Sequence, residues 1–161
     1  VRGHTAMLGP HAEFDEIADM RNFFLDKLEA NGHSAEGRDI PMARLIAVAD
    51  TDGEAEQIAR RGAEWIVKAY KNESKGMANP VKTIEVDGKI QEVDDIDRYL
   101  QDAIIWGTPE RVIDLLHRLE EEMYLDYLMC APLSHSSFMM FTEKVMPHFL
   151  GSSTQPIRQV V

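Results

Sequence analysis

The eight residues M-A-R-L-I-A-V-A, Met42 to Ala49, decide the fold class. They form a short, nearly continuous apolar run, with Pro41 before it and the turn residues Asp50 to Gly53 after it. Such a run is typical of a strand covered on both faces, as in a parallel sheet flanked by helices. Directly afterwards, Thr51 and Glu54 match an S/T-x-x-E capping box. The stretch therefore predicts a buried strand that is followed at once by a helix.

The remaining chain repeats this alternation of helix and strand. Apolar positions from Phe14 to Leu28 recur at three- and four-residue steps, and Asn31-Gly32 follows as a stop, which predicts an amphipathic helix. Gly107-Thr108-Pro109-Glu110 predicts another helix start, because Thr suits the N-cap and Pro the first helical position. A second buried strand is predicted at residues 125–133. A last helix is expected to bury Phe138, Phe141, Val145 and Phe149.

Two parallel strands, each followed by a helix, indicate an α/β fold built from βα repeats. Two strands that are covered on both faces leave unpaired edges, which usually drive association. We therefore expect either a longer parent protein or a partner that supplies the rest, and a homo- or hetero-oligomer. A monodisperse, monomeric species of 18 kDa would contradict this expectation.

Residues 72–104 differ from the rest, with Gly76, Pro80, an acidic cluster around Asp95 and few apolar positions. Connections of this length in compact domains tend to be lids, binding loops or disordered excursions. We predict a mobile lid that excludes water from a reaction site; the alternative is a disordered insertion without a catalytic part. Within it, the Asp-Gly pair at residues 87–88 allows a hairpin, and residues 96–100 equally allow a helix.

The amino-acid composition argues against some classes of binding partner. Among 161 residues, 17 Lys and Arg stand against 28 Asp and Glu, a net charge of −11, which argues against nucleic acid and anionic membranes. No apolar run approaches the roughly 20 residues of a membrane span. The single cysteine, Cys130, is expected to be a buried, unreactive thiol, and a reducing cytoplasmic location fits best. The tail 151–161 is predicted to be flexible.

Three motifs in order resemble a known family: A-R-L-I-A-V-A-D-T-D at 43–52, G-T-P-E at 107–110 and E-K-V-M-P-H-F at 143–149. Together they resemble the C-terminal part of the luciferase-like flavin-dependent monooxygenases, the bacterial luciferase family. The resemblance implies that residues 1–150 are the C-terminal portion of a (β/α)8 TIM barrel, about its last two strands and their helices. These would be the seventh and eighth strands.

The resemblance also implies an oxidoreductase that uses reduced FMN, supplied by a separate flavin reductase, and O2 on a small organic substrate. Two alternatives remain open. One is a non-catalytic flavin-binding or structural relative, and the other is an oxidoreductase that depends on coenzyme F420. The family's main catalytic positions lie mostly on earlier strands, so no catalytic residue is assigned to this chain.

Barrel enzymes place their chemistry at the carboxyl ends of the strands, here Asp50-Thr51 and Pro132 to His135. His135 is a candidate hydrogen-bonding group for flavin or substrate. Ser134 either binds a phosphate or caps the last helix. Arg2 is a candidate for the flavin phosphate through a bidentate contact. No metal site is expected, because His4, His11 and Asp15 lack ligand spacing, and the acidic cluster Asp94, Asp95 and Asp97 lacks the elements of a calcium loop.

Overall fold

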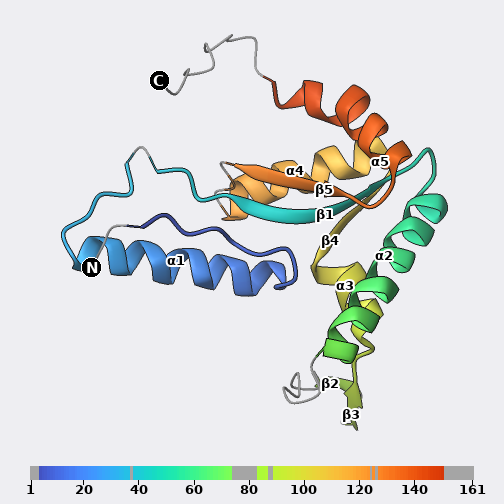
Figure 1. The fold of residues 1–161 in the computed structure, drawn as a ribbon, viewed down its shortest axis with the longest axis horizontal. Coiled ribbons are helices and arrows are strands. Elements are labelled where there is room, and N and C mark those ends of the chain that lie inside the picture. The colour runs from blue at the N-terminus through green and yellow to red at the C-terminus, as the bar shows by residue number, and fades with distance from the viewer. Residues whose placement is uncertain are drawn as a thin grey trace.

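The computed structural model describes residues 4–36, 38–73, 83–86, 89–123, 125 and 127–150. Helices and strands alternate along the chain, as the sequence predicts (Figure 1). The elements are α1 (Phe14–Ala30), β1 (Met42–Val48), α2 (Asp52–Glu73), β2 (Thr83–Val86), β3 (Lys89–Glu92), α3 (Asp95–Asp102), β4 (Ile104–Gly107), α4 (Pro109–Met123), β5 (Leu128–Pro132) and α5 (His135–Met140). A π-helical turn (Phe141–Val145) and a 3-10 turn (Met146–His148) follow α5.

The main sheet has three parallel strands in the order β4-β1-β5. The two strands predicted from the sequence, β1 and β5, are direct neighbours, with Arg44 opposite Cys130 in the register. β4 lies between β1 and β5 in the chain, so the order of the strands in this sheet differs from their order in the sequence. The fold is thus α/β with a parallel sheet and flanking helices, consistent with part of a (β/α)8 barrel.

A third strand, β4, corrects the expectation of two strands. It is only four residues long and follows a polar segment, so its apolar run is too short to be recognised without its partner. β4 pairs with the same edge of β1 that Leu8 binds. Leu8 N donates to Pro41 O at 2.8 Å, and Ala43 N donates to Leu8 O at 2.9 Å. Ala49 N donates to Gly107 O at 3.3 Å on the same edge. Two short segments therefore share this edge of the central strand.

Successive side chains of a strand point to opposite faces, and other elements cover both faces of β1. One face carries Met42, Ile46 and Val48 and packs on side chains from α1, α4 and the C-terminal turns, among them Ile17, Val112, Leu116, Phe141 and Val145. The other face carries Leu45 and Ala47 and packs on α2 and α3 through Ala59, Ala63, Ile66, Tyr99 and Leu100. The prediction of a strand buried on both faces is confirmed for β1.

The same prediction is wrong for β5. Met129, Cys130 and Ala131 are exposed, and Met129 retains 41% of its accessible surface. The physical reason is position, because β5 is the end strand of the described sheet and has a neighbour only in β1. Cys130 is therefore an exposed thiol rather than a buried one. Phe138, predicted to face the core, is also exposed, whereas Phe141 and Val145 are buried as expected.

The segment 72–104 contains both structures that its sequence allowed. β2 and β3 form an antiparallel hairpin in which Val86 pairs with Lys89, and α3 follows. Asp94 caps α3 by accepting from the backbone N–H of Ile96 at 2.8 Å and of Asp97 at 3.3 Å. Asp94 and Asp97 are thus accounted for by structural contacts.

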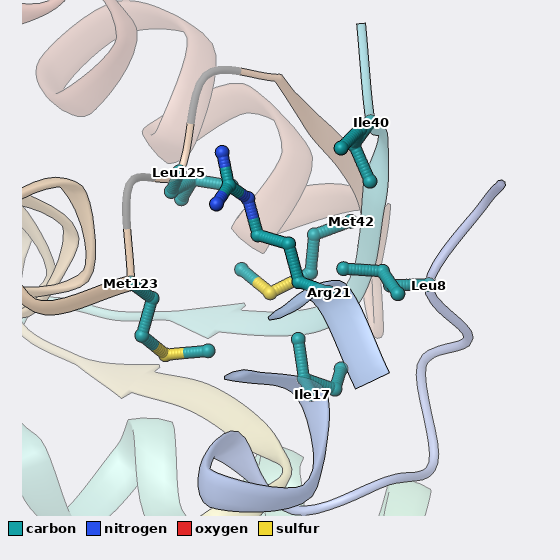
Figure 2. A pocket seen from close by; sticks show the side chains of 7 residues that line it. All are labelled: Leu8, Ile17, Arg21, Ile40, Met42, Met123 and Leu125. Carbon is teal, nitrogen blue, oxygen red and sulfur yellow. The ribbon is translucent and has the colours of Figure 1, made fainter. Parts of the chain in front are cut away.

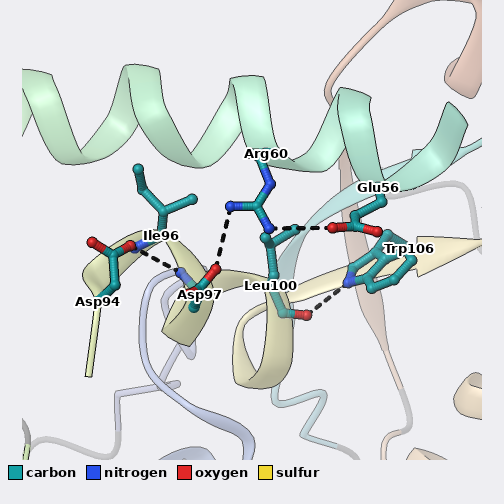
Figure 3. A network of polar contacts seen from close by, with 7 residues as sticks. All are labelled: Glu56, Arg60, Asp94, Ile96, Asp97, Leu100 and Trp106. Atoms are coloured by element: carbon teal, nitrogen blue, oxygen red, sulfur yellow. Dashed lines mark hydrogen bonds and ion pairs between the residues drawn. The ribbon is translucent and has the colours of Figure 1, made fainter. Parts of the chain in front are cut away.

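The end of this segment is anchored to α2 (Figure 3). Arg60 of α2 pairs with Asp97 of α3 at 3.2 Å, and the indole N–H of Trp106 donates to Leu100 O at 2.7 Å. Tyr99 and Leu100 are buried between α2 and the sheet. Residues 95–104 therefore pack against the core through Tyr99 and Leu100, and the lid prediction is confined to residues 72–94.

Candidate functional site

The carboxyl ends of the three parallel strands define one end of the sheet, which we call the carboxyl edge. β1 ends at Val48, β4 at Gly107 and β5 at Pro132, and each strand is followed closely by a helix (Figure 1). The predicted side chains of Asp50, Thr51, Ser134 and His135 all follow these strand ends. The fold therefore brings the two predicted segments, far apart in sequence, to the same edge.

Ser137 joins the end of β1 to α5. Its buried hydroxyl accepts from Val48 N at 3.1 Å and donates to Val48 O at 3.0 Å. β5 does not extend this far, since its last pairing sets Pro132 opposite Ile46. A side-chain hydroxyl thus satisfies both backbone groups of Val48 where the neighbouring strand has ended. The sequence gives no sign of this role, because Ser137 reads as an ordinary polar position in a short helix.

Ser134 is the N-cap of α5. Its Oγ accepts from Ser137 N at 3.0 Å, donates to Ser137 Oγ at 2.9 Å and lies 3.0 Å from Ser136 Oγ. Of the two roles that the sequence left open, capping is the one for which the structure supplies the contacts.

His135 is exposed at the first position of α5. Its ring lies beside that of Phe138, with 6.5 Å between the ring centroids, and it makes no hydrogen bond or ion pair to the described residues. Both ring nitrogens are accordingly open to a bound molecule. The third predicted residue, Arg2, lies outside the described residues.

The carboxyl edge also carries charged side chains in pairs. Lys144 lies 3.1 Å from Asp50, and Arg111 lies 3.2 Å from Asp52. Hydrogen bonds from its own backbone N–H and from the Thr108 hydroxyl, together with the charge of Lys144, lower the pKa of Glu110. Each of these two cations thus already faces a carboxylate.

Gly107 is required at the end of β4. Its φ is +146°, and a Cβ at this position would come within 2.6 Å of the Arg111 side chain. Arg111 in turn lies over the Trp106 ring, 4.2 Å from its centroid. The glycine of the G-T-P-E motif therefore permits the close approach of the helix that follows.

These groups fit a flavin ring or an organic substrate only in part. His135 and Ser136 are exposed and offer hydrogen-bond donors and acceptors. The described cations of this edge, Lys144 and Arg111, are paired with carboxylates, so they do not by themselves form a site for a flavin phosphate. The carboxyl edge can thus contribute contacts to a flavin site without completing one.

A small apolar hollow lies at the opposite end of the sheet (Figure 2). Met42, the first residue of β1, lines it together with Leu8, Ile17, Arg21, Ile40, Met123 and Leu125. In barrel enzymes the catalytic residues lie at the carboxyl ends of the strands, whereas residues at the amino ends contribute to stability. We interpret this hollow as a packing gap between α1, β1 and the end of α4.

The sequence did not predict the role of one charged residue in the core. Arg44 lies in the middle of β1 and is fully buried. The available signal was its position, because it is the single charged residue in an apolar run that predicts a doubly covered strand. The sequence gives no further signal, because the residues that contact Arg44, among them Ala12 and Ala103, are distant from it in the chain.

Comparison with known proteins supports the fold. A family model described as luciferase-like monooxygenase matches residues 2–126. None of the curated proteins matches the chain.

Two solved structures are similar. The monooxygenase RslO1 from Streptomyces bottropensis is 16% identical, with a TM-score of 0.58 over 91% of this chain and 42% of that one. The riboflavin lyase RcaE, solved with modified FMN and riboflavin, is 21% identical, with a TM-score of 0.60 over 89% of this chain and 37% of that one. The chain thus spans about two fifths of each solved chain, and the likeness shows a shared fold.

No described helix is long and apolar enough to cross a membrane.

Proposed function

The chain belongs to the luciferase-like monooxygenase family, and from this premise we propose that it is the C-terminal part of a flavin-dependent monooxygenase. Its chemistry would use reduced FMN and O2 on a small organic substrate, with a flavin reductase as the source of reduced FMN. The match over residues 2–126 carries the proposal. The gathering of three strand ends and their polar loops at the carboxyl edge is consistent with it.

His135 is the residue of this chain that we propose to contact flavin or substrate. Its exposed imidazole can donate and accept hydrogen bonds near neutral pH, and it has no polar partner among the described residues. Ser134, whose hydroxyl is already used in the cap, would act by fixing the start of α5 and hence the position of His135. Arg2 remains the sequence-based proposal for the phosphate. Reduced FMN, when bound, would supply the electrons for oxygen transfer.

Residues 72–94 remain our proposed lid. Closure would keep water from the reacting groups and favour product over wasted peroxide. Limited proteolysis with trypsin in the complete enzyme should cut first near Lys75, Lys82 or Lys89, and flavin with substrate should protect these sites. Deletion of the segment should raise peroxide leakage; unchanged product yield and leakage would remove the lid from the proposal.

The test of the function uses the purified protein that contains this chain. Flavin absorbance and quenching of FMN fluorescence measure binding, and turnover with NADH and a flavin reductase measures O2-dependent product. Binding with product supports the monooxygenase, whereas binding without product supports a non-catalytic relative. Preference for F420 over FMN supports the third alternative, and absence of any flavin binding would overturn the proposal.

The role of His135 is tested by His135→Ala, with His117→Ala as the matched control. Both histidines are exposed and helical, but His117 pairs with Glu120 on α4 at 3.0 Å, away from the strand ends. We expect His135→Ala to weaken flavin or substrate binding about tenfold, the effect of one hydrogen bond of about 1.4 kcal/mol. Equal binding by the two variants would reduce His135 to a surface residue.

A further inference from the structure

The strongest unexplained feature of the core is Arg44. It lies four residues before the end of β1, about 13 Å from the carboxyl edge at roughly 3.3 Å per residue, and it is fully buried. It is therefore separate from the site proposed for flavin. A buried guanidinium requires partners for its five N–H donors, because an unpaired buried charge is costly.

Only part of the guanidinium group has partners. Nη1 donates to Ala12 O at 2.6 Å and has longer contacts to Ala103 O at 3.4 Å and Pro10 O at 3.5 Å. The ring of Phe14 lies 4.6 Å from the guanidinium carbon and covers one face. Nε and Nη2 are buried, and neither has a hydrogen-bond partner among the described residues.

The two unpartnered nitrogens lie on the same edge of the group. The N–H of Nε and one N–H of Nη2 point in the same direction, which is the fork that matches two oxygens of a carboxylate or phosphate. The carbonyl contacts of Nη1 hold the opposite side of the group in place. The fork is thus held in position, and its Nε and Nη2 donors have no hydrogen-bond acceptor among the described residues.

No described carboxylate neutralises Arg44. The nearby acid Glu13 is paired with Arg98 at 3.5 Å, and Arg98 itself has a buried Nε without a partner. Burial and the charge of Arg44 lower the pKa of His11, which favours the neutral imidazole, so His11 cannot offset the charge of Arg44. Burial lowers the pKa of Arg44 to about 10, which leaves it protonated at neutral pH. The protein has a net charge of −11, yet among the described residues the buried cation Arg44 has no carboxylate partner.

We propose that the Nε–Nη2 edge of Arg44, on the side of the guanidinium away from the carbonyl groups of Ala12 and Ala103, binds an oxyanion, a carboxylate or a phosphate group. Because the proposal rests on Arg44 and its neighbours alone, it stands or falls independently of the flavin proposal.

The test compares thermal unfolding in formate, phosphate and chloride at equal ionic strength. We expect the midpoint to rise saturably in formate or in phosphate beyond its value in chloride, since a ligand that binds only the folded state stabilises it. A larger rise in formate identifies a carboxylate site, and a larger rise in phosphate identifies a phosphate site. Equal midpoints in all three salts would overturn the proposal.

Two variants separate the fork from simple charge. Arg44→Lys keeps the positive charge and loses the two-donor edge, so we expect it to lose most of the oxyanion-dependent rise; Arg44→Met should lose all of it. Arg60→Met is the matched control, because Arg60 is an exposed arginine paired with Glu56 and Asp97. Its response should equal that of the unmodified protein. A full response in Arg44→Lys or Arg44→Met would overturn the proposal.

A measurement on the unmodified protein covers the case in which the Arg44 variants do not fold. The arginine Nε–H signals are followed by two-dimensional NMR during titration with formate and with phosphate. We expect one protected Nε–H signal to shift with saturation, while the signals of exposed arginines shift little. Absence of any saturable shift would mean that water satisfies this edge and that no oxyanion site exists.

Discussion

β1 and β5 are neighbouring parallel strands with similar apolar sequences and opposite burial. Ile46, in the centre of β1, is 0% exposed, whereas Met129 of β5 is 41% exposed. β1 has strands on both edges and helices on both faces, and β5 lies at the end of the described sheet. An apolar run therefore reports which side chains a strand carries, while the position of the strand in the sheet decides how far they are buried.

The comparison also shows where the fold is open. In a closed barrel every strand has two neighbours. The exposed apolar side chains of β5 and of the turns after it include Met129, Phe138 and Met146. If the chain is part of a flavin-dependent barrel enzyme, as we propose, this side is expected to be covered in the whole protein.

The largest contrast should come from truncating one apolar side chain in each strand. Ile46→Ala removes a fully buried side chain and should lower the free energy of unfolding by about 2–5 kcal/mol. Met129→Ala is the matched variant in β5 and should lower the free energy of unfolding by less than about 1 kcal/mol. Urea unfolding measures both. Similar losses would show that β5 is buried in solution and would break the comparison.

The junction between the two strands is tested by Ser137→Ala. Loss of the hydroxyl leaves the N–H and C=O of Val48 without their partner beyond the end of β5, so we expect a loss of about 1–3 kcal/mol. Ser136→Ala changes an exposed hydroxyl one residue away and should stay within about 0.5 kcal/mol. Urea unfolding of the two variants decides, and a silent Ser137→Ala would place water rather than Ser137 at Val48.

The helix that covers one face of β1 is tested at its first turn. The Thr51 hydroxyl accepts from Glu54 N at 3.3 Å and lies 3.2 Å from the Glu54 carboxylate. Thr51→Ala should lower the free energy of unfolding by about 1 kcal/mol, and Thr51→Ser should restore most of it, because serine is an equally good cap. Thermal or urea unfolding measures the pair; an equal loss in both would point to the threonine methyl group instead.

The smallest effect concerns the exposed thiol of β5. The residue is exposed as a whole, but partial burial of the thiol group raises the pKa of Cys130 to about 11 from 9.0. Since the thiolate is the reactive form, alkylation by iodoacetamide should be slow at pH 7 and rise about tenfold per pH unit toward pH 11. Because the pKa of this thiol is higher in the folded state, its contribution to the free energy of unfolding is constant below about pH 9. The free energy of unfolding then falls as the pH rises toward 11.

This prediction separates exposure from reactivity. A rate at pH 7 equal to that of a free thiol would contradict the raised pKa. A rate that stays negligible even at pH 11 would indicate a covered strand edge. A rate between these two limits that rises about tenfold per pH unit agrees with an exposed strand whose thiol group is partly buried.

Much of the fold was accessible from local sequence. The helix from Phe14, the strand from Met42 and the caps at Thr51 and Thr108 are confirmed, and the C-cap of α1 is Asn31. These features depend on contacts within a few residues, such as a hydroxyl and the backbone N–H three positions later. Local chemistry can therefore be read directly from the order of residues.

The candidate site was accessible only in part. The convergence of Asp50 and His135 on one edge follows from the parallel sheet, which the buried runs predict. The role of Ser137 depends on where β5 stops, and the state of Arg44 depends on carbonyl groups more than 30 residues before it and almost 60 after it. Neither contact leaves a pattern in the sequence.

The sequence by itself determined the longer helices, the strands β1 and β5, their alternation and their family, because helix caps and apolar periodicity act over a few residues. The tertiary structure alone decided that β4 pairs with β1, that β5 lies at an edge, and that Arg44 holds an open pair of donors in the core. These outcomes depend on which distant segments share an edge or a face. Strand burial and the pairing of polar groups are properties of that arrangement, and no single segment carries them.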